Sequence, residues 1–291
     1  MTAAARPAPR AGLADRGKPG AGSSLWVYAL LVGGLALMVG PFLWMVLGSI
    51  KPEADFLRNP PTLWPSRITT DNFGRLFDQL TFPRYFFNSS VIAFVVTVGN
   101  LIFCPMLGYA LAKLRWRGKG LVMAVVLATL MVPAGVTLIP NFILMSNLGL
   151  VNSYPGLILP FLAGPFGVFL MRQFMLGVPN ELLEAARIDG ALEFRIFWSV
   201  VMPLATPVLA TLGILTFLGN WNSFIYPLVM AQEPDMYTLP VALATFATGQ
   251  YQADHGMLMA GSVILVVPVL IVFILFQRWI TEGIATTGLK G

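Results

Sequence analysis

The stretch ELLEAARIDGALEFRIFWSVVMP, residues 181–203, is the most charged part of the second half of a chain that is otherwise largely apolar. Its first part predicts a short helix. Asn180 can accept hydrogen bonds from the free N–H groups at the start, and Glu181 and Glu184 suit the positive end of the helix dipole. Gly190 suits a left-handed cap at the end. A helix of about nine residues is too short and polar to span a membrane and marginal alone, so it needs a partner surface.

The composition indicates a membrane protein with several spans. Of the 291 residues, 57% are hydrophobic and 11% are charged, whereas soluble domains carry about 25% charged residues. The net charge of +5 does not come from basic clusters interleaved with aromatic residues, so nucleic acid is not an expected partner. Cys104 is the single cysteine and His255 the single histidine, and we therefore expect neither a disulfide nor a metal site.

Apolar runs long enough to cross a bilayer, about 20 residues each, predict an all-α fold with six transmembrane helices. Pro160 and Pro165 interrupt the fourth run, which membrane helices tolerate when neighbours satisfy the freed backbone groups. The six runs are 26–50, 89–112, 121–140, 157–176, 204–229 and 257–279.

The distribution of Lys and Arg predicts that both termini are cytoplasmic. Most of the 18 basic residues lie in the N-terminal tail, in the connections after the second and fourth runs, and at the C-terminus. Loops 141–156 and 230–256 hold neither Lys nor Arg. The predicted organisation is a disordered cytoplasmic tail at 1–24, a first helix with its outer loop at 25–88, a transmembrane core at 89–280 with a cytoplasmic loop at 177–203, and a cytoplasmic tail at 281–291.

Ionisable residues are missing from the centres of the six runs, which argues against proton-coupled carriers and pumps. A sodium-coupled carrier remains open, because broken helices and backbone carbonyls can hold its ion. A phosphate-binding loop needs an earlier glycine and a Ser or Thr after the lysine, and RGKG at 117–120 has neither. We therefore expect a transport subunit and not an enzyme, with its energy source on another chain.

Polar uncharged residues beside aromatic ones in the fifth run are candidates for a substrate pathway. Amide and hydroxyl groups can bond sugar hydroxyls, and aromatic rings can stack on the apolar face of a sugar. The alternative is that they join helices by hydrogen bonds or lie in an aromatic belt at the interface. The residues are Asn220, Trp221, Asn222, Ser223 and Tyr226.

The short helix has a face that suits docking. Leu182, Ala185 and Ala186 lie on one side at helical spacing, and Asp189 extends that line. Small residues let the groove of another protein close around the helix, and Glu184 and Asp189 supply polar contacts. An ordinary loop helix is the alternative, because alanine and glutamate are good helix formers.

This stretch resembles the signature cytoplasmic loop of permease subunits of bacterial ABC importers. The pattern is Glu184-Ala185-Ala186, three residues, Gly190, nine residues, and Val200-Val201-Met202-Pro203, with Val and Met where Ile and Leu are usual. Four further stretches resemble the six-helix permease of maltose-type carbohydrate importers, namely SIKPEADFLRNPPTLWPSRITTDNFGRLF, FFNSSVIA, WNSFIYPL and FQRWITEGIATTGLKG.

The resemblance implies an assembly in the bacterial inner membrane. Its members are a homologous second permease, two ATPase subunits that bind ATP and Mg, and an extracytoplasmic solute-binding protein that delivers a sugar. This chain itself would bind no cofactor. The residues expected to couple to the ATPase are Leu182, Glu184, Ala185, Ala186, Asp189, Gly190 and Pro203.

Loop 230–256 is the candidate contact for the binding protein, through Glu233, Asp235 and Asp254. The C-terminal stretch TEGIATTGLKG is expected to reach the ATPase. Two other functions stay open: a sodium-coupled secondary carrier, and an ABC importer of a phosphorylated polyol such as glycerol 3-phosphate.

Overall fold

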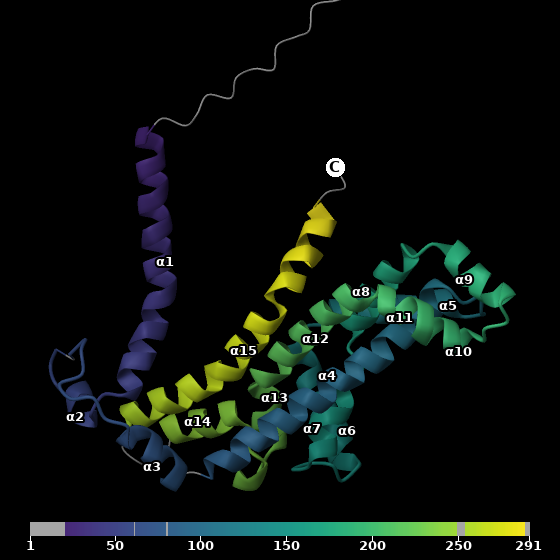
Figure 1. Cartoon of the computed structure of the whole chain (residues 1–291). Coiled ribbons are helices and arrows are strands. Elements are labelled where there is room, and N and C mark those ends of the chain that lie inside the picture. The colour runs from purple at the N-terminus through teal and green to yellow at the C-terminus, as the bar shows by residue number, and fades with distance from the viewer. Residues whose placement is uncertain (1–20, 61, 80, 249–253, 289–291) are drawn as a thin grey trace, which may run out of the picture. The chain divides into compact units, whose positions relative to one another are not determined.

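The computed structural model describes residues 21–60, 62–79, 81–248 and 254–288, and all regular elements in these ranges are helical (Figure 1). The chain divides into two compact units, Met1–Trp44 and Met45–Gly291. The first helix, α1 (Ala21–Ser49), crosses the boundary between them. Residues 1–20 of the predicted N-terminal tail lie outside the described residues, and α1 already begins at Ala21, inside that predicted tail.

Long apolar helices confirm the all-α membrane class. Four segments are long and apolar enough to cross a membrane by themselves: Trp26–Ser49, Phe82–Ala112, Tyr154–Leu176 and His255–Gln277. Two further pairs of helices pass the same test together but are bent, by 108° and by 81°. The described residues therefore hold four spans, or up to six if each bent pair is one span. The six-span topology and the orientation of the termini stay predictions.

The run 121–140, expected as a single span, is the first bent pair. Helix α5 (Lys119–Met131) is followed after a break by α6 (Ala134–Asn147), and the two meet at 108°. Val132 between them has an extended backbone, with φ −82° and ψ 120°. A residue before proline is disfavoured in the helical region, so Pro133 ends α5 at this point.

The fifth run is also divided. Helix α12 (Thr206–Trp221) ends before α13 (Ile225–Met230), and three short elements precede it: α10 (Glu193–Ile196), the π-helical η2 (Phe197–Val201) and α11 (Met202–Leu204). The remaining elements are α2 (Glu53–Phe56), α3 (Asp71–Gln79), α4 (Phe82–Ala112), α7 (Tyr154–Ile158), η1 (Leu159–Phe161), α8 (Pro165–Leu176), α9 (Asn180–Ile188), η3 (Pro234–Met236), α14 (Leu239–Thr248) and α15 (His255–Gly288).

Helix α14 lies within the stretch 230–256, which the sequence predicts only as a loop. Its side chains Leu239, Val241 and Ala242 are buried. These residues are apolar at positions that face the bundle, and the run is too short to have been counted as a span. Part of this predicted loop is therefore core.

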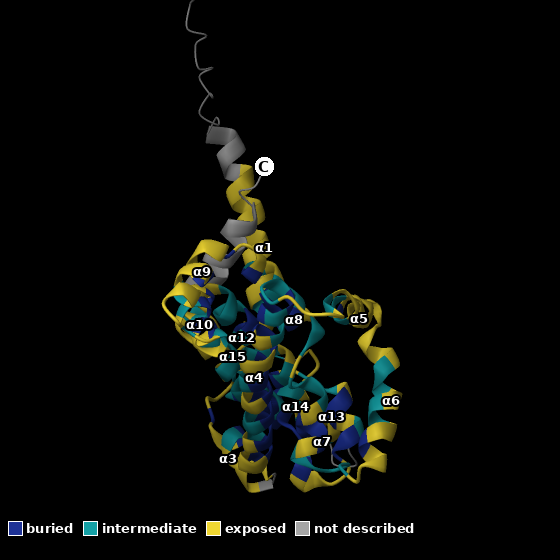
Figure 2. Ribbon diagram, turned by 90° about the vertical axis from the view of Figure 1, so that its right-hand side faces the viewer, coloured by how far each residue is buried: buried dark blue, intermediate teal, exposed yellow. Residues whose placement is uncertain are grey.

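Helix α4 is the centre of the second unit, because residues from it contribute to all three buried apolar clusters. Figure 2 shows buried residues along its length. Helix α8 packs closely on it because both carry glycine at the contact: a Cβ on Gly108 would lie 2.9 Å from the Cβ of Met171, and one on Gly167 would lie 2.7 Å from the Sγ of Cys104. Small residues at such contacts are typical of helix packing in membranes.

Asn100 of α4 completes the hydrogen bonds of the interrupted fourth run. Its side chain is buried, its Oδ1 accepts from Gly164 N at 2.8 Å, and its Nδ2 donates to Phe161 O at 2.7 Å and to Val96 O at 2.9 Å. Gly164 and Phe161 flank the break before α8, where the chain leaves its helix. Within a bilayer no water can satisfy such groups, so one amide makes the break possible.

We expect Asn100→Leu to destabilise the protein strongly, since each buried backbone group left without a partner costs about 1–3 kcal/mol. The measurement is the melting temperature in detergent. The control is Thr129→Val, because the Thr129 hydroxyl is exposed and bonds only Val125 O of its own helix. Equal melting temperatures for the two variants would contradict the role given to Asn100.

Candidate functional site

Helix α9 forms where the sequence predicts it and ends with the expected glycine cap. Gly190 has φ +79°, its N–H bonds Arg187 O at 3.0 Å, and Ala191 N bonds Ala186 O at 3.0 Å. This pair of bonds is the Schellman arrangement, which satisfies the last carbonyls of the helix with backbone groups alone. The left-handed cap at Gly190 is confirmed.

The start of α9 differs from the prediction. Pro179 occupies the capping position, and no side chain caps the first N–H groups. The Oδ1 of Asn180 accepts instead from Lys113 Nζ at 2.8 Å, and the same ammonium donates to Val178 O at 2.6 Å. Because Lys113 follows the last residue of α4, these bonds fix the start of α9 to the end of α4. Burial lowers the pKa of Lys113 below its usual value.

A carboxylate also joins this loop to α4. Glu193 accepts from Tyr109 OH at 2.6 Å through Oε2 and from Arg187 Nε at 2.7 Å through Oε1. The hydrogen bond to Glu193 raises the pKa of Arg187. Tyr109 belongs to α4, Arg187 to α9 and Glu193 to α10, so one side chain holds three helices.

Leu183 anchors α9 in the apolar core. It is 1% exposed and belongs to the same buried cluster as Tyr109 and Ile196. Leu183 is not among the residues predicted from the sequence, which lie on the face of Leu182. The signal was available: Leu182 and Leu183 point to different sides of a helix, and only one of them can face a partner.

The opposite face of α9 and its continuation are exposed (Figure 2). Large apolar side chains lie there without cover from the described part of the chain: Leu182 is 45% exposed, Ile188 87%, Leu192 80% and Phe194 67%. Exposed apolar groups gathered at one place indicate an interaction site. Of the other predicted coupling residues, Ala186 is half-buried, and Glu184, Ala185, Asp189, Gly190 and Pro203 are exposed.

The prediction for this face was incomplete, because it lacked Ile188, Leu192 and Phe194. Ile188 follows Ala185 by one helical turn, so its spacing indicates the same side of the helix. Leu192 and Phe194 come after Gly190, which ends the helix, so helical spacing does not place them. Only the backbone course after Gly190 brings Leu192 and Phe194 beside α9. We call the exposed set Leu182, Ala185, Ile188, Asp189, Leu192 and Phe194 the α9 face.

The candidate pathway residues have partners within the chain. Trp221 is 2% exposed, its Nε1 donates to Leu265 O at 2.9 Å, and Tyr226 OH donates to Gly156 O at 2.8 Å. Both bonds join different helices, which is the alternative that the sequence left open for them. The amides of Asn220 and Asn222 donate to carbonyls of their own helix, Asn222 is exposed and Ser223 is half-buried.

The three predicted acidic contacts differ in exposure. Glu233 and Asp235 are exposed, whereas the Asp254 side chain is 14% exposed and forms an ion pair with Arg75. Asn152 holds the loop beside Glu233, since its Oδ1 accepts from Gln232 N and from Glu233 N, both at 3.1 Å. Glu233 and Asp235 are therefore presented on an ordered loop.

A model of the family described as binding-protein-dependent transport system inner membrane component matches residues 105–286, more than half of the chain. The chain belongs to this family. The resemblance to ABC importer permeases, read from Glu184, Gly190 and Pro203, is thereby confirmed.

Curated relatives match this permease over most of its length. It is 42% identical over 258 residues to the arabinooligosaccharides transport system permease protein AraQ of Halalkalibacterium halodurans, covering 88% of this chain and 92% of that protein. It is 34% identical over 261 residues to the diacetylchitobiose uptake system permease protein NgcG of Streptomyces coelicolor, covering 89% and 86%. With the sn-glycerol-3-phosphate transport system permease protein UgpE of Yersinia pestis it shares 30% identity over 270 residues, covering 90% and 96%.

Solved structures agree with the fold. A chain of a bacterial ABC transporter involved in the import of the acidic polysaccharide alginate superposes with a TM-score of 0.80 at 27% identity, covering 90% of this permease and 98% of that chain. A chain from the alginate transporter in complex with a periplasmic protein bound to alginate pentasaccharide superposes with a TM-score of 0.64 at 14% identity, covering 88% and 94%. The second likeness supports the fold alone.

We expect Glu193→Ala to loosen α9, because it removes the partners of both Tyr109 and Arg187. Tyr109→Phe should have a smaller effect, since it leaves the bond between Arg187 and Glu193 in place. The measurement is hydrogen–deuterium exchange of residues 180–190. Arg195→Ala, at an exposed position of the same short helix, is the control, and an equal rise in that variant would contradict the assignment.

Proposed function

We propose that this chain is the membrane-spanning permease subunit of an ATP-driven, binding-protein-dependent importer of a sugar, and that α9 couples it to a separate ATPase subunit. One observation carries the proposal: α9 presents an exposed apolar face while Leu183, Lys113 and Glu193 hold it firmly against α4. A helix held in this way can transmit a displacement by a partner subunit to the membrane helices.

The α9 face has the chemistry of a docking surface. Ile188, Leu192 and Phe194 supply apolar area that a groove on the ATPase would bury, at about 25 cal/mol per Å². Ala185 leaves room for close approach, and Glu184 and Asp189 offer polar contacts at the rim. ATP and Mg would be held by the ATPase subunits, and α9 would lie on the cytoplasmic side, as the Lys and Arg distribution predicts.

The other end of the second unit would face the binding protein. Glu233 and Asp235 are exposed carboxylates on an ordered loop, and that stretch holds neither Lys nor Arg. A basic patch on the binding protein would complement them, and such charges mainly raise the rate of encounter. A homologous permease would complete the pathway.

A neutral oligosaccharide is the substrate that we favour. Relatives named for arabinooligosaccharides, diacetylchitobiose and lactose share 32% to 42% identity with this chain. Amides such as Asn220 and Asn222 suit hydroxyl groups. The relative named for sn-glycerol 3-phosphate, at 30% identity, keeps a phosphorylated polyol as the second candidate. A phosphate would need cations or backbone N–H groups along the pathway.

We predict that Gly190→Asp abolishes uptake at normal membrane abundance, as does Glu184→Lys, because each places wrong charge in a docking surface that binding would desolvate. The measurement is uptake of a labelled sugar in cells, with the subunit quantified by immunoblot. Gly190→Asn is the matched control, since asparagine tolerates the left-handed backbone and adds no charge. Normal uptake by Gly190→Asp would exclude docking through this face.

Affinity purification from native membranes tests the assembly. We expect an ATPase subunit and a second permease to copurify with the chain, and the ATPase to be lost with Gly190→Asp. A chain that transports alone in vesicles without ATP would overturn the proposed function.

A further inference from the structure

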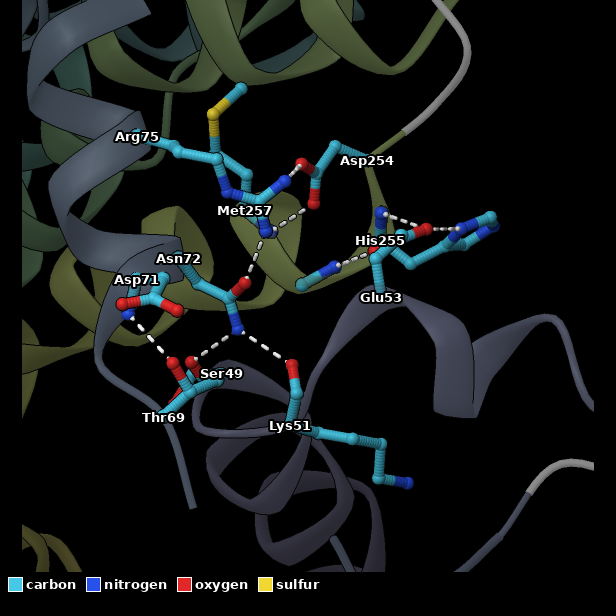
Figure 3. Close-up of polar contacts among 11 residues, drawn as sticks. Ser49, Lys51, Glu53, Thr69, Asp71, Asn72, Arg75, Asp254, His255 and Met257 are labelled. Carbon is cyan, nitrogen blue, oxygen red and sulfur yellow. Dashed lines mark hydrogen bonds and ion pairs between the residues drawn. The ribbon is translucent and has the colours of Figure 1, made fainter. Parts of the chain in front are cut away.

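The end of α1 and the start of α15 meet beside α3, and polar side chains from the segment between α1 and α4 serve both helix ends (Figure 3). Asn72 of α3 is fully buried, and its Nδ2 donates to Ser49 O and to Lys51 O, both at 2.8 Å. These carbonyls lie at the C-terminal end of α1, where helices leave acceptors without partners. Asn72 therefore caps the end of α1.

Glu53 caps the start of α15 from a position 202 residues away in the sequence. Its Oε1 accepts from His255 N at 3.1 Å and contacts His255 Nδ1 at 2.9 Å, and its Oε2 accepts from Gly256 N at 2.9 Å. The ring of Phe56 stacks on the ring of His255, with centroids 5.6 Å apart. A carboxylate at a helix N-terminus is favoured by the free N–H groups and the helix dipole.

A second carboxylate stands at the same helix end. Asp254 accepts from Met257 N at 2.9 Å and pairs with Arg75 of α3, which also donates to Asn72 Oδ1 at 2.6 Å. Burial raises the pKa of Asp254, and the nearby Glu53 raises it further. Partial burial raises the pKa of Glu53, but the bonds from Gly256 and His255 outweigh it and leave that pKa below its usual value. Two like charges at one helix end oppose each other.

The contacts fall into a buried set around Asn72 and a partly exposed set around Glu53. Asn72 is 0% exposed, and Leu76 and Met257 beside it belong to one apolar cluster. The side chains of Glu53 and His255 are 25% and 48% exposed. A partly exposed ionic contact is weak because water competes for it, whereas breaking the buried set would leave polar groups without partners. Of the two sets, the Glu53 contact is therefore the easier to break.

We propose that the bonds from Glu53 to the first residues of α15 form a releasable clasp, which is closed in the resting importer and opens when the pathway turns outward. This inference rests on the proposed function and adds a conformational control to it. Glu53 is a positioning residue: it ties the segment after α1 to α15, and any movement of the start of α15 away from α2 must break its bonds. A contact present in one state alone shifts the population toward that state.

The first test is ATP hydrolysis by the reconstituted importer without its binding protein. We expect Glu53→Ala to raise this basal rate roughly fivefold, because a partly exposed ionic contact is weak, and Glu53→Gln to raise it less because one acceptor oxygen remains. The control is Asp71→Asn, since Asp71 is another carboxylate of this segment, at 71% exposed, and it pairs with Arg67 at 3.8 Å. An unchanged rate in Glu53→Ala at normal complex yield would overturn the clasp.

The second test holds the clasp shut. Glu53→Cys and His255→Cys are combined and joined with a short bismethanethiosulfonate reagent, which a thiol reductant removes. We expect sugar uptake to fall when the bridge forms and to return on reduction, while each single-cysteine variant stays active. Uptake that continues across the bridge would show that the contact never opens. If the unmodified complex hydrolyses no ATP, the proposed function itself fails, which separates the two outcomes.

Discussion

The side chain of Asn100 makes the arrangement of the second unit possible. The fourth apolar run breaks at prolines in a region where lipid offers no hydrogen bonds. One amide from α4 supplies partners to both sides of that break, to Gly164 and to Phe161. With this bond in place, α8 can approach α4 closely at its glycines and carry α9 to the end of the bundle. The position of the α9 face thus depends on a polar contact far from it along the chain.

Much of the fold could be predicted from the sequence, because helices in lipid must satisfy their own backbone and therefore appear as long apolar runs. The bends could not be predicted from these runs. Pro133 ends α5 and gives a 108° turn, yet Pro41, Pro105 and Pro268 lie inside continuous helices. The restriction on the residue before a proline applies equally at all of them, so local sequence does not tell which proline ends a helix.

The candidate site also combines features that local sequence predicts with contacts that it does not. The helix of α9 and its cap at Gly190 followed from local rules, since a left-handed glycine is a property of the chain itself. The side chains that hold α9 against α4 could not be predicted by local rules. Tyr109 and Lys113 lie far from α9 in sequence, and nothing local indicates that they bond Glu193 and Asn180. Trp221 and Tyr226 likewise have aromatic rings that suit a sugar. In the folded chain, however, their polar atoms donate hydrogen bonds to backbone carbonyls of neighbouring helices.

The Schellman cap of α9 makes the form of the helix independent of the side chains on its exposed face. Gly190 and Ala191 cap the end of the helix with backbone hydrogen bonds alone, and the buried side chain of Leu183 anchors the helix in the apolar core. The side chains at 182, 185, 188 and 192 are therefore free of any part in building the helix. Their identities can change together, through evolution or by design, while the scaffold keeps its form. Under the proposed coupling through α9, a permease of this kind could be matched to a new ATPase by changes on one exposed face.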